Sequence, residues 1–98
     1  MAFLVDPDGV ERQAVHALVG FVGRKVLEIG CGDGRLTRRY AARAGSVLAL
    51  DPKPEEIARA ERTMPEPLRS KVAFRVADVT IAELPAGTFD VALFARSL

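Results

Sequence analysis

Two kinds of apolar pattern alternate along the chain, one with helical spacing and the other in short runs. Apolar positions three and four residues apart predict amphipathic helices at residues 10–19, at 34–44 and from about 52 to 64. Short apolar runs between turn residues predict buried strands at 26–29, 46–50, 72–76 and 89–94. The chain is therefore predicted to alternate between helices and strands.

This alternation predicts the fold class. A strand, a helix and a second strand in sequence pair the two strands in parallel through a right-handed crossover. Numbered in chain order, the first three predicted strands then lie in the order 3, 2, 1. A fourth strand beyond strand 1 gives the order 3-2-1-4, and such sheets bind ligands at the switch point between strands 1 and 4. The sequence predicts an α/β protein with a Rossmann-like open parallel sheet and flanking helices.

The composition fits one globular domain over residues 1–98, since 49% of the residues are apolar and 28% are charged. The formal net charge of +1 gives no bulk attraction to nucleic acid or to an anionic membrane. No apolar stretch approaches the roughly 18 residues of a membrane helix, and Asp6, Asp8 and Glu11 are unlike a signal peptide. We expect a cytoplasmic protein with no membrane partner and no indicated nucleic-acid partner. The chain has one cysteine, Cys31, and one histidine, His16, so we expect neither an intramolecular disulfide nor a metal site.

Alternate glycines follow the predicted 26–29 strand in the sequence EIGCGDG, residues 28–34. Glycine adopts positive φ angles easily, and backbone without a Cβ can approach a ligand closely. Free N–H groups in this loop could hold a carboxylate or a phosphate at the start of the next helix. The spacing is GxGxG, whereas dinucleotide sites use GxGxxG, so NAD binding is disfavoured. The same glycines could also form only a tight turn.

The segment VLEIGCGDG, residues 26–34, resembles the first motif of the class I S-adenosylmethionine-dependent methyltransferases. The resemblance implies that Glu28 steadies the loop and lies near the methionine portion of the cofactor. It also implies backbone contacts to the cofactor from Gly30, Cys31 and Gly32. Asp51 ends the second strand, at the family position that binds the ribose hydroxyls. Two hydroxyl donors suit one carboxylate acceptor.

Two later segments extend the resemblance. Asp78 stands where the family carboxylate accepts a hydrogen bond from the adenine amino group, and Val79 offers a backbone contact. Residues 89–94, FDVALF, resemble the family's fourth strand, after which Ala95 and Arg96 would border the sulfonium end of the cofactor. The residues that we expect to bind S-adenosylmethionine are Glu28, Gly30, Cys31, Gly32, Gly34, Asp51, Pro52, Asp78, Val79, Phe94 and Ala95.

Simpler roles stay open for several of these side chains. Asp51 could be the N-cap of a helix that begins at Pro52, and Asp78 could bind only N–H groups of its own loop. Cys31 fits a small residue in a crowded turn better than a nucleophile, because no base is evident beside it. Four arginines predict a solvated face of the 34–44 helix, with contact to a polyanion as the alternative: Arg35, Arg38, Arg39 and Arg43.

The resemblance implies transfer of a methyl group from S-adenosylmethionine to an unidentified acceptor. The cofactor carries its own leaving group, so the protein mainly aligns the reactants, and we assign no catalytic residue. Family members usually continue beyond the fourth strand. We therefore expect an incomplete fold in which strand 89–94 is an open edge, and a homo-oligomer formed through that edge. The alternatives are a non-catalytic methyltransferase-like interaction module and, less favoured, a NAD(P)-binding oxidoreductase domain.

Overall fold

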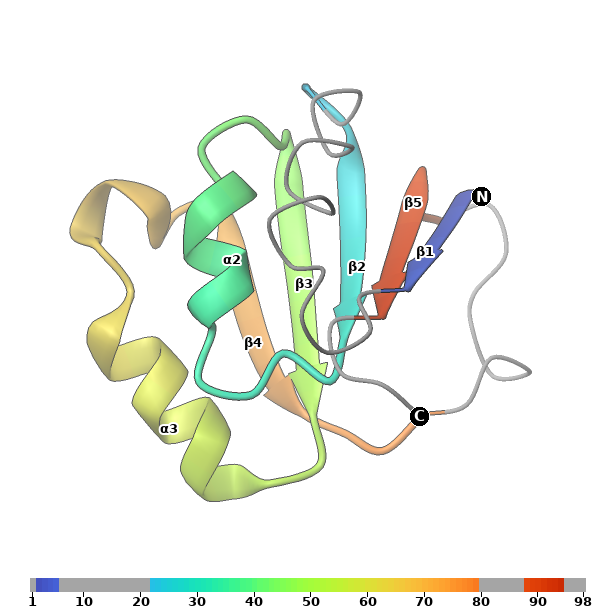
Figure 1. The fold of residues 1–98 in the computed structure, drawn as a ribbon. Helices are drawn as coiled ribbons and strands as arrows, with labels where there is room; N and C mark the ends of the chain where they lie inside the picture. The colour runs from blue at the N-terminus through green and yellow to red at the C-terminus, as the bar shows by residue number, and fades with distance from the viewer. Residues whose placement is uncertain (1, 6–21, 80–87, 95–98) are drawn as a thin grey trace.

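The computed structural model of the chain describes residues 2–5, 22–79 and 88–94 (Figure 1). Most of the predicted elements are present, and the predicted helix at 10–19 lies outside the described residues. In chain order the described elements are β1 (Ala2–Val5), β2 (Lys25–Ile29), α2 (Arg35–Tyr40), β3 (Ser46–Asp51), α3 (Pro54–Thr63), the 3-10 turn η2 (Glu66–Leu68), β4 (Val72–Val76) and β5 (Val91–Phe94).

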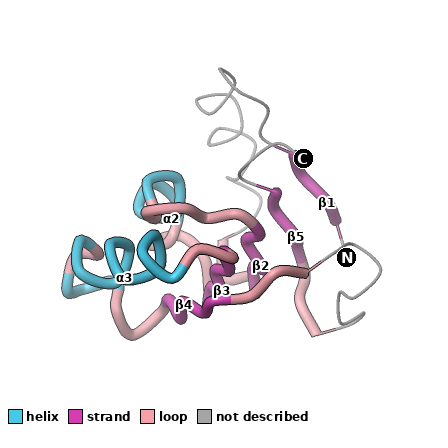
Figure 2. The backbone as a smooth tube through the Cα atoms, turned by 90° about the horizontal axis from the view of Figure 1, so that it is seen from below, coloured by secondary structure: helices cyan, strands magenta, loops and turns pink. Residues whose placement is uncertain are grey.

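The strands form one parallel sheet in the order β1-β5-β2-β3-β4. The part β4-β3-β2-β5 confirms the predicted order 3-2-1-4, with β4 at an edge as predicted. Both helices lie on the same side of the sheet (Figure 2). Because the chain leaves β2 toward β3 on one side and β5 pairs on the other, the switch point falls between β2 and β5.

Strand β1 was not predicted, and its presence corrects the expectation that β5 is an open edge. Ala2 pairs with Val91 and Val5 pairs with Phe94, so β5 has a neighbour on both sides. No residue of β5 is more than 5% exposed. The self-association expected through that edge therefore loses its structural basis. The sequence did carry a signal for β1, because a short apolar run precedes the turn residues at 6–9.

The core lies between the helices and one face of the sheet. Every second side chain of a strand points to the same face of the sheet. The neighbouring residues Val26 of β2 and Val47 of β3 belong to one buried cluster with Leu36 and Ile57 of the helices. The last residue of α2, Tyr40, is among the largest fully buried side chains. Of the helices among the described residues, none is long and apolar enough to span a bilayer.

Helix α2 is shorter than the predicted 34–44 segment, because the chain turns back toward β3 after Tyr40. The Arg43 N–H donates to the Tyr40 carbonyl at 2.9 Å, a three-residue spacing that tightens the helix end. The Gly45 N–H then donates to the Arg24 carbonyl at 2.8 Å, just before β2. A tightened turn therefore ends the helix, and the chain then contacts the residue before β2.

Helix α3 begins two residues later than the sequence suggested. Its N-cap is Lys53 rather than Asp51, and Pro54 is its first residue. Acidic side chains lie in its first turn and Arg62 in its last turn, which suits the helix dipole. The N-cap role considered for Asp51 is therefore wrong, and this carboxylate is available for other contacts.

Candidate functional site

The candidate site lies where the parallel strands end. Strands β2, β3 and β4 all run in the same direction, so their carboxyl ends share one edge of the sheet (Figure 1). The loop at residues 30–34 follows β2 and leads into α2. This places the glycine loop beside the end of β3 and next to the β2–β5 switch point, where open α/β sheets bind ligands.

The loop has the backbone conformation that its glycines predict. Gly30, Gly32 and Gly34 have φ angles of 78°, 56° and 82°, a region that other residues avoid. Gly34 is the N-cap of α2. A side chain at any of these positions would strain the turn, which explains the alternate glycines.

The expectation of free N–H groups in this loop is wrong for most of its residues. The N–H groups of Gly30 and Cys31 both donate to the Leu50 carbonyl, at 2.8 and 3.0 Å, and that of Gly34 donates to the Cys31 carbonyl at 3.0 Å. The Arg35 N–H donates to the Asp33 carboxylate at 3.1 Å. Acceptors at the end of β3 and within the loop therefore bind most of these N–H groups. They are not free to bind an anion.

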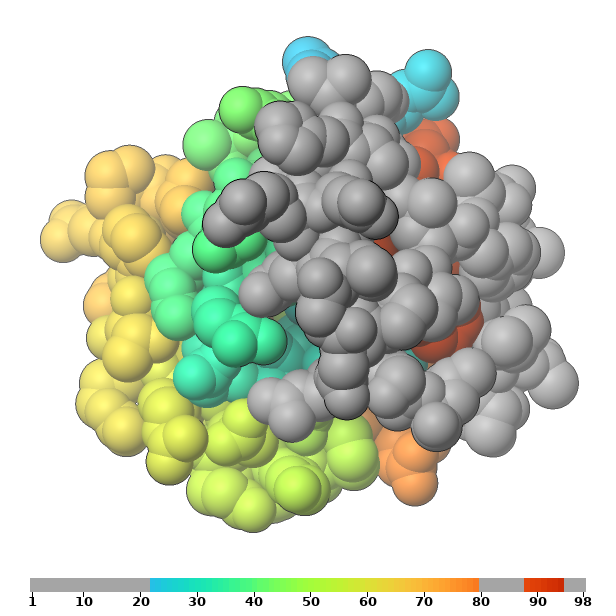
Figure 3. All heavy atoms as spheres, in the orientation of Figure 1, coloured from blue at the N-terminus to red at the C-terminus, as the bar shows by residue number. Residues whose placement is uncertain are grey.

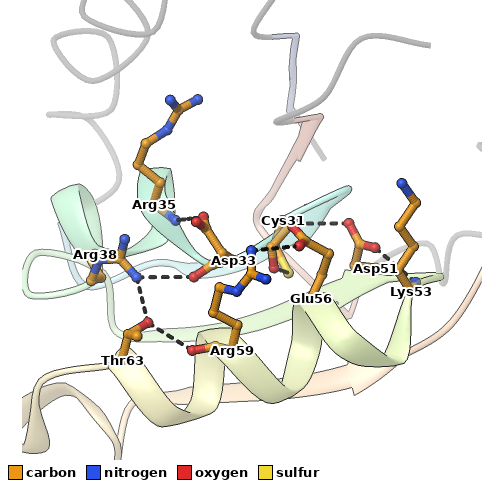
Figure 4. Close-up of polar contacts among 10 residues, drawn as sticks. Cys31, Asp33, Arg35, Arg38, Asp51, Lys53, Glu56, Arg59 and Thr63 are labelled. Carbon is orange, nitrogen blue, oxygen red and sulfur yellow. Dashed lines mark hydrogen bonds and ion pairs between the residues drawn. The ribbon is translucent and has the colours of Figure 1, made fainter.

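Asp51, the last residue of β3, holds the centre of the loop. Its Oδ2 accepts the Gly32 N–H at 2.9 Å and its Oδ1 accepts the Lys53 N–H at 2.9 Å. The carboxylate is 5% exposed and points from the end of β3 toward the loop (Figure 4). Sequence reasoning placed Asp51 correctly at this edge but did not foresee that it shapes the loop.

Glu28 lies inside the protein, between β2 and α2. It is 0% exposed, and its Oε1 accepts the Thr37 hydroxyl at 2.7 Å and the Tyr40 hydroxyl at 2.6 Å. Burial, reinforced by the negative charge of Glu28, raises the pKa of Tyr40 well above its usual value near 10. Tyr40 thus keeps its proton and acts as a donor. Nothing in the sequence indicated that Thr37 and Tyr40 donate to Glu28, although both residues share the inner face of the predicted helix.

Gly34 also brings three elements together at close range. A Cβ at this position would lie 3.3 Å from the Cβ of Ala60 on α3 and 3.5 Å from the ring of Phe74 on β4. A methyl group at residue 34 would press on Ala60 and touch the Phe74 ring, so the missing side chain favours close packing of the start of α2 against α3 and β4. The Arg38 guanidinium strengthens this junction by donating to the Asp33 carbonyl at 3.0 Å and to the Thr63 hydroxyl at 2.9 Å (Figure 4).

The structure places the other expected site residues around this edge with different exposure. Cys31 is buried, with its sulfur 3.6 Å from the Gly32 carbonyl, as expected of a small residue in a crowded turn. Phe94 is buried at the end of β5. Pro52 and Asp78 are exposed, Val79 is half-buried, and Ala95 lies outside the described residues.

Asp78 and the arginine face of the 34–44 segment lie at the surface around the site. Asp78 follows β4 by two residues and makes no hydrogen bond to the loop or to Asp51 among the described residues. The arginine face of the 34–44 segment is mostly solvated as predicted, because Arg35, Arg39 and Arg43 are exposed and Arg38 is half-buried. α2 and α3 lie side by side at the surface (Figure 3).

The strand order, the glycine loop after β2 and the buried carboxylate at the end of β3 define an open α/β domain, a class in which ligands bind at the switch point. The comparisons with known proteins identify the family. The methyltransferase-domain family model matches residues 26–98, and the chain belongs to this family. The resemblance found in the sequence to class I S-adenosylmethionine-dependent methyltransferases is confirmed.

Relatives with curated names and solved structures agree with this assignment. The chain is 38% identical over 76 residues to a magnesium-protoporphyrin O-methyltransferase of Rhodobacter capsulatus, covering 78% of this chain and 33% of that protein. It is 47% identical over 62 residues to the ribosomal RNA small subunit methyltransferase A of Moorella thermoacetica, covering 63% and 21%. A crystal structure of an S-adenosylmethionine-dependent methyltransferase from Mesorhizobium loti superposes with a TM-score of 0.70 at 28% identity, covering 89% and 39%. The chain thus spans about a third of the length of such relatives.

Proposed function

We propose that this chain is the S-adenosylmethionine-binding domain, residues 1–98, of a methyltransferase that transfers the cofactor's methyl group to an acceptor. The observation that carries the proposal is the buried Asp51 carboxylate at the end of β3, bonded to the centre of the glycine loop. A structural relative at 28% identity bears the name of an S-adenosylmethionine-dependent methyltransferase, which supports the same cofactor.

The chemistry of Asp51 fits an adenosyl ligand. Each of its carboxylate oxygens accepts one backbone N–H, and a carboxylate offers about four acceptor positions in all. One lone pair on each oxygen is therefore left for a ribose hydroxyl. Because the two N–H bonds fix the carboxylate, a ligand meets an acceptor that is already oriented.

The residues of the loop have positioning roles in this proposal. Gly30, Cys31 and Gly32 present backbone atoms without bulky side chains, and the end of β3 holds their conformation. Asp78 and Val79 lie beyond the end of β4, where they could contact the adenine. When bound, S-adenosylmethionine supplies both the methyl group and its leaving group, so alignment is the main task of the protein.

The acceptor stays open in this proposal. One relative is named for magnesium-protoporphyrin and another for ribosomal RNA, although each matches more than half of this chain. Matches to relatives with such different names support a common cofactor site rather than a common acceptor. A cytoplasmic location stays a prediction of the sequence, whereas the strand edge on which self-association was predicted is paired with β1.

Thermal unfolding with three ligands tests the proposal: S-adenosylmethionine, S-adenosylhomocysteine and NAD. A ligand present at 100 times its Kd stabilises the folded state by about 2.7 kcal/mol. We expect either adenosyl ligand to raise the Tm of the wild type, and Asp51→Ala to abolish the shift. A matched control is Asp90→Ala, which removes a carboxylate that also accepts a backbone N–H, from Lys25 at 2.8 Å, before β5 begins. This control should keep the full shift.

Two results would contradict the proposal and favour an alternative. A Tm shift with NAD alone would indicate an oxidoreductase domain. No shift with any ligand would indicate a non-catalytic interaction module.

A further inference from the structure

We propose that Thr37 and Tyr40 are positioning residues that hold the cofactor loop from the side of α2, through the carboxylate of Glu28. This inference rests on the proposed function, because it concerns how the same loop is prepared for its ligand. Among the described residues, neither hydroxyl has a hydrogen bond to the loop itself. Both meet the carboxylate two residues before the loop begins, at 2.7 and 2.6 Å.

The two hydroxyls and the carboxylate come from the elements on either side of the loop. Glu28 lies on β2 just before residues 30–34, whereas Thr37 and Tyr40 lie on α2 just after them. The hydrogen bonds therefore tie together the strand that enters the loop and the helix that leaves it. A loop with both ends fixed has few conformations to choose from, even with three glycines at positive φ.

Burial makes this contact strong and specific. Glu28 and Thr37 are 0% exposed and Tyr40 is 1% exposed. A carboxylate taken out of water needs hydrogen-bond donors, and bonds to a charged acceptor are stronger than bonds between neutral groups. Two hydroxyls on successive turns of one helix face meet a single oxygen, Oε1, which fixes the rotation of α2 against β2.

The loop is held independently from the opposite side. There the Leu50 carbonyl and the Asp51 carboxylate bind the N–H groups of residues 30–32. Loss of the α2 contacts would leave this β3 side intact but would let the start of α2 shift relative to it. The ligand would then have to order the loop on binding, so its affinity would fall. We expect a loss of about tenfold.

Paired substitutions at Thr37 separate a positioning role from a purely structural one. Thr37→Val keeps the shape and removes the hydroxyl, whereas Thr37→Ser keeps the hydroxyl and removes a methyl group. Isothermal titration with S-adenosylhomocysteine gives Kd, and thermal unfolding without ligand gives Tm. We expect Thr37→Val to raise Kd about tenfold and Thr37→Ser to stay within about twofold of the wild type.

Further variants give controls for stability and for coupling. Tyr40→Phe should raise Kd in the same way and provides a second route if Thr37→Val does not fold. Val47→Ala shortens a core side chain of β3 away from the loop, so it should lower Tm without raising Kd. In a cycle with Glu28→Gln, the effects of Thr37→Val and Glu28→Gln on Kd should not add, because both changes break the same contact.

The outcomes distinguish the two proposals. No binding of S-adenosylhomocysteine by the wild-type chain would overturn the proposed function and this inference with it. Binding by the wild type together with an unchanged Kd in Thr37→Val and Tyr40→Phe would overturn the inference alone. So would an equal rise in Kd for Val47→Ala, or additive effects in the cycle with Glu28→Gln.

Discussion

Replacing Gly34 by alanine tests whether the loop and the two elements behind it are packed as closely as the structure shows. An L residue at a φ of 82° costs about 1–2 kcal/mol. A methyl group 3.3 Å from the Cβ of Ala60, with the Phe74 ring at 3.5 Å, adds a packing cost of about 1–3 kcal/mol. Alanine also reduces the conformational freedom of the unfolded chain, which offsets about 0.4–1 kcal/mol of this loss in stability. We expect a net loss of about 2–3 kcal/mol in the free energy of unfolding.

Gly23→Ala is the matched control for this substitution. Gly23 has a similar φ of 72°, but among the described residues a Cβ there would meet nothing within 4 Å. Gly23→Ala therefore has the backbone cost without the packing cost. We expect it to lower the free energy of unfolding by about 1 kcal/mol, once the reduced freedom of the unfolded chain is included. The difference between the two variants measures the contact of Gly34 with α3 and β4.

Thermal and urea unfolding of the two variants give the comparison. For a domain of this size, 1 kcal/mol corresponds to about 4–8 °C in Tm. Gly34→Ala should therefore lower Tm by about 10–20 °C, and Gly23→Ala by about 4–8 °C. Equal losses in the two variants would refute the close packing at Gly34, and the third loop glycine would then serve backbone conformation alone.

Two other properties can be checked in the same way. Because the pKa of Tyr40 is raised above its value near 10 in the unfolded chain, its contribution to stability is complete below about pH 10 and falls as pH rises further. Urea unfolding between pH 8 and 11 should show a smaller fall for Tyr40→Phe than for the wild type, and parallel curves would contradict the burial of this hydroxyl. At the edge strand β4, the Ala77 N–H donates to the Asp51 carbonyl. Backbone N–H groups alternate in direction along a strand, so the N–H of Ala73 also faces β3, whereas that of Val76 points away from the sheet. Ala73→Pro should therefore cost roughly 1–3 kcal/mol more than Val76→Pro in urea unfolding, and the opposite order would contradict the register of β4.

The sequence predicted those parts of the fold that depend on local pattern. Strand β3 has a continuous apolar run, β2 has a short one interrupted by Glu28, and α3 has prolines at its start and apolar residues at helical spacing. The strand order followed from the handedness of crossovers and was confirmed. The predicted end of α2 was wrong, because the chain turns after Tyr40 although the apolar spacing continues to Ala44.

The candidate site was predicted in composition but not in its internal bonding. The glycines, Glu28 and Asp51 were all singled out, since their types and positions at strand ends are visible in the sequence. Three bonds of the two carboxylates were not foreseen, because they join residues that are 9 to 19 positions apart: those from Gly32, Thr37 and Tyr40. Side-chain direction across a strand and a helix decides such bonds, and it becomes visible only once the elements are packed.

The shared acceptor at the end of β3 has a consequence for how the glycine loop moves. Its amide protons at Gly30, Cys31 and Gly32 all lie on acceptors of Leu50 and Asp51. Exposure of these three protons to solvent therefore requires the first half of the loop to leave the end of β3, and the freedom of glycine alone does not set their exchange rate. The neighbouring strand thus restrains a segment that is rich in the most flexible residue.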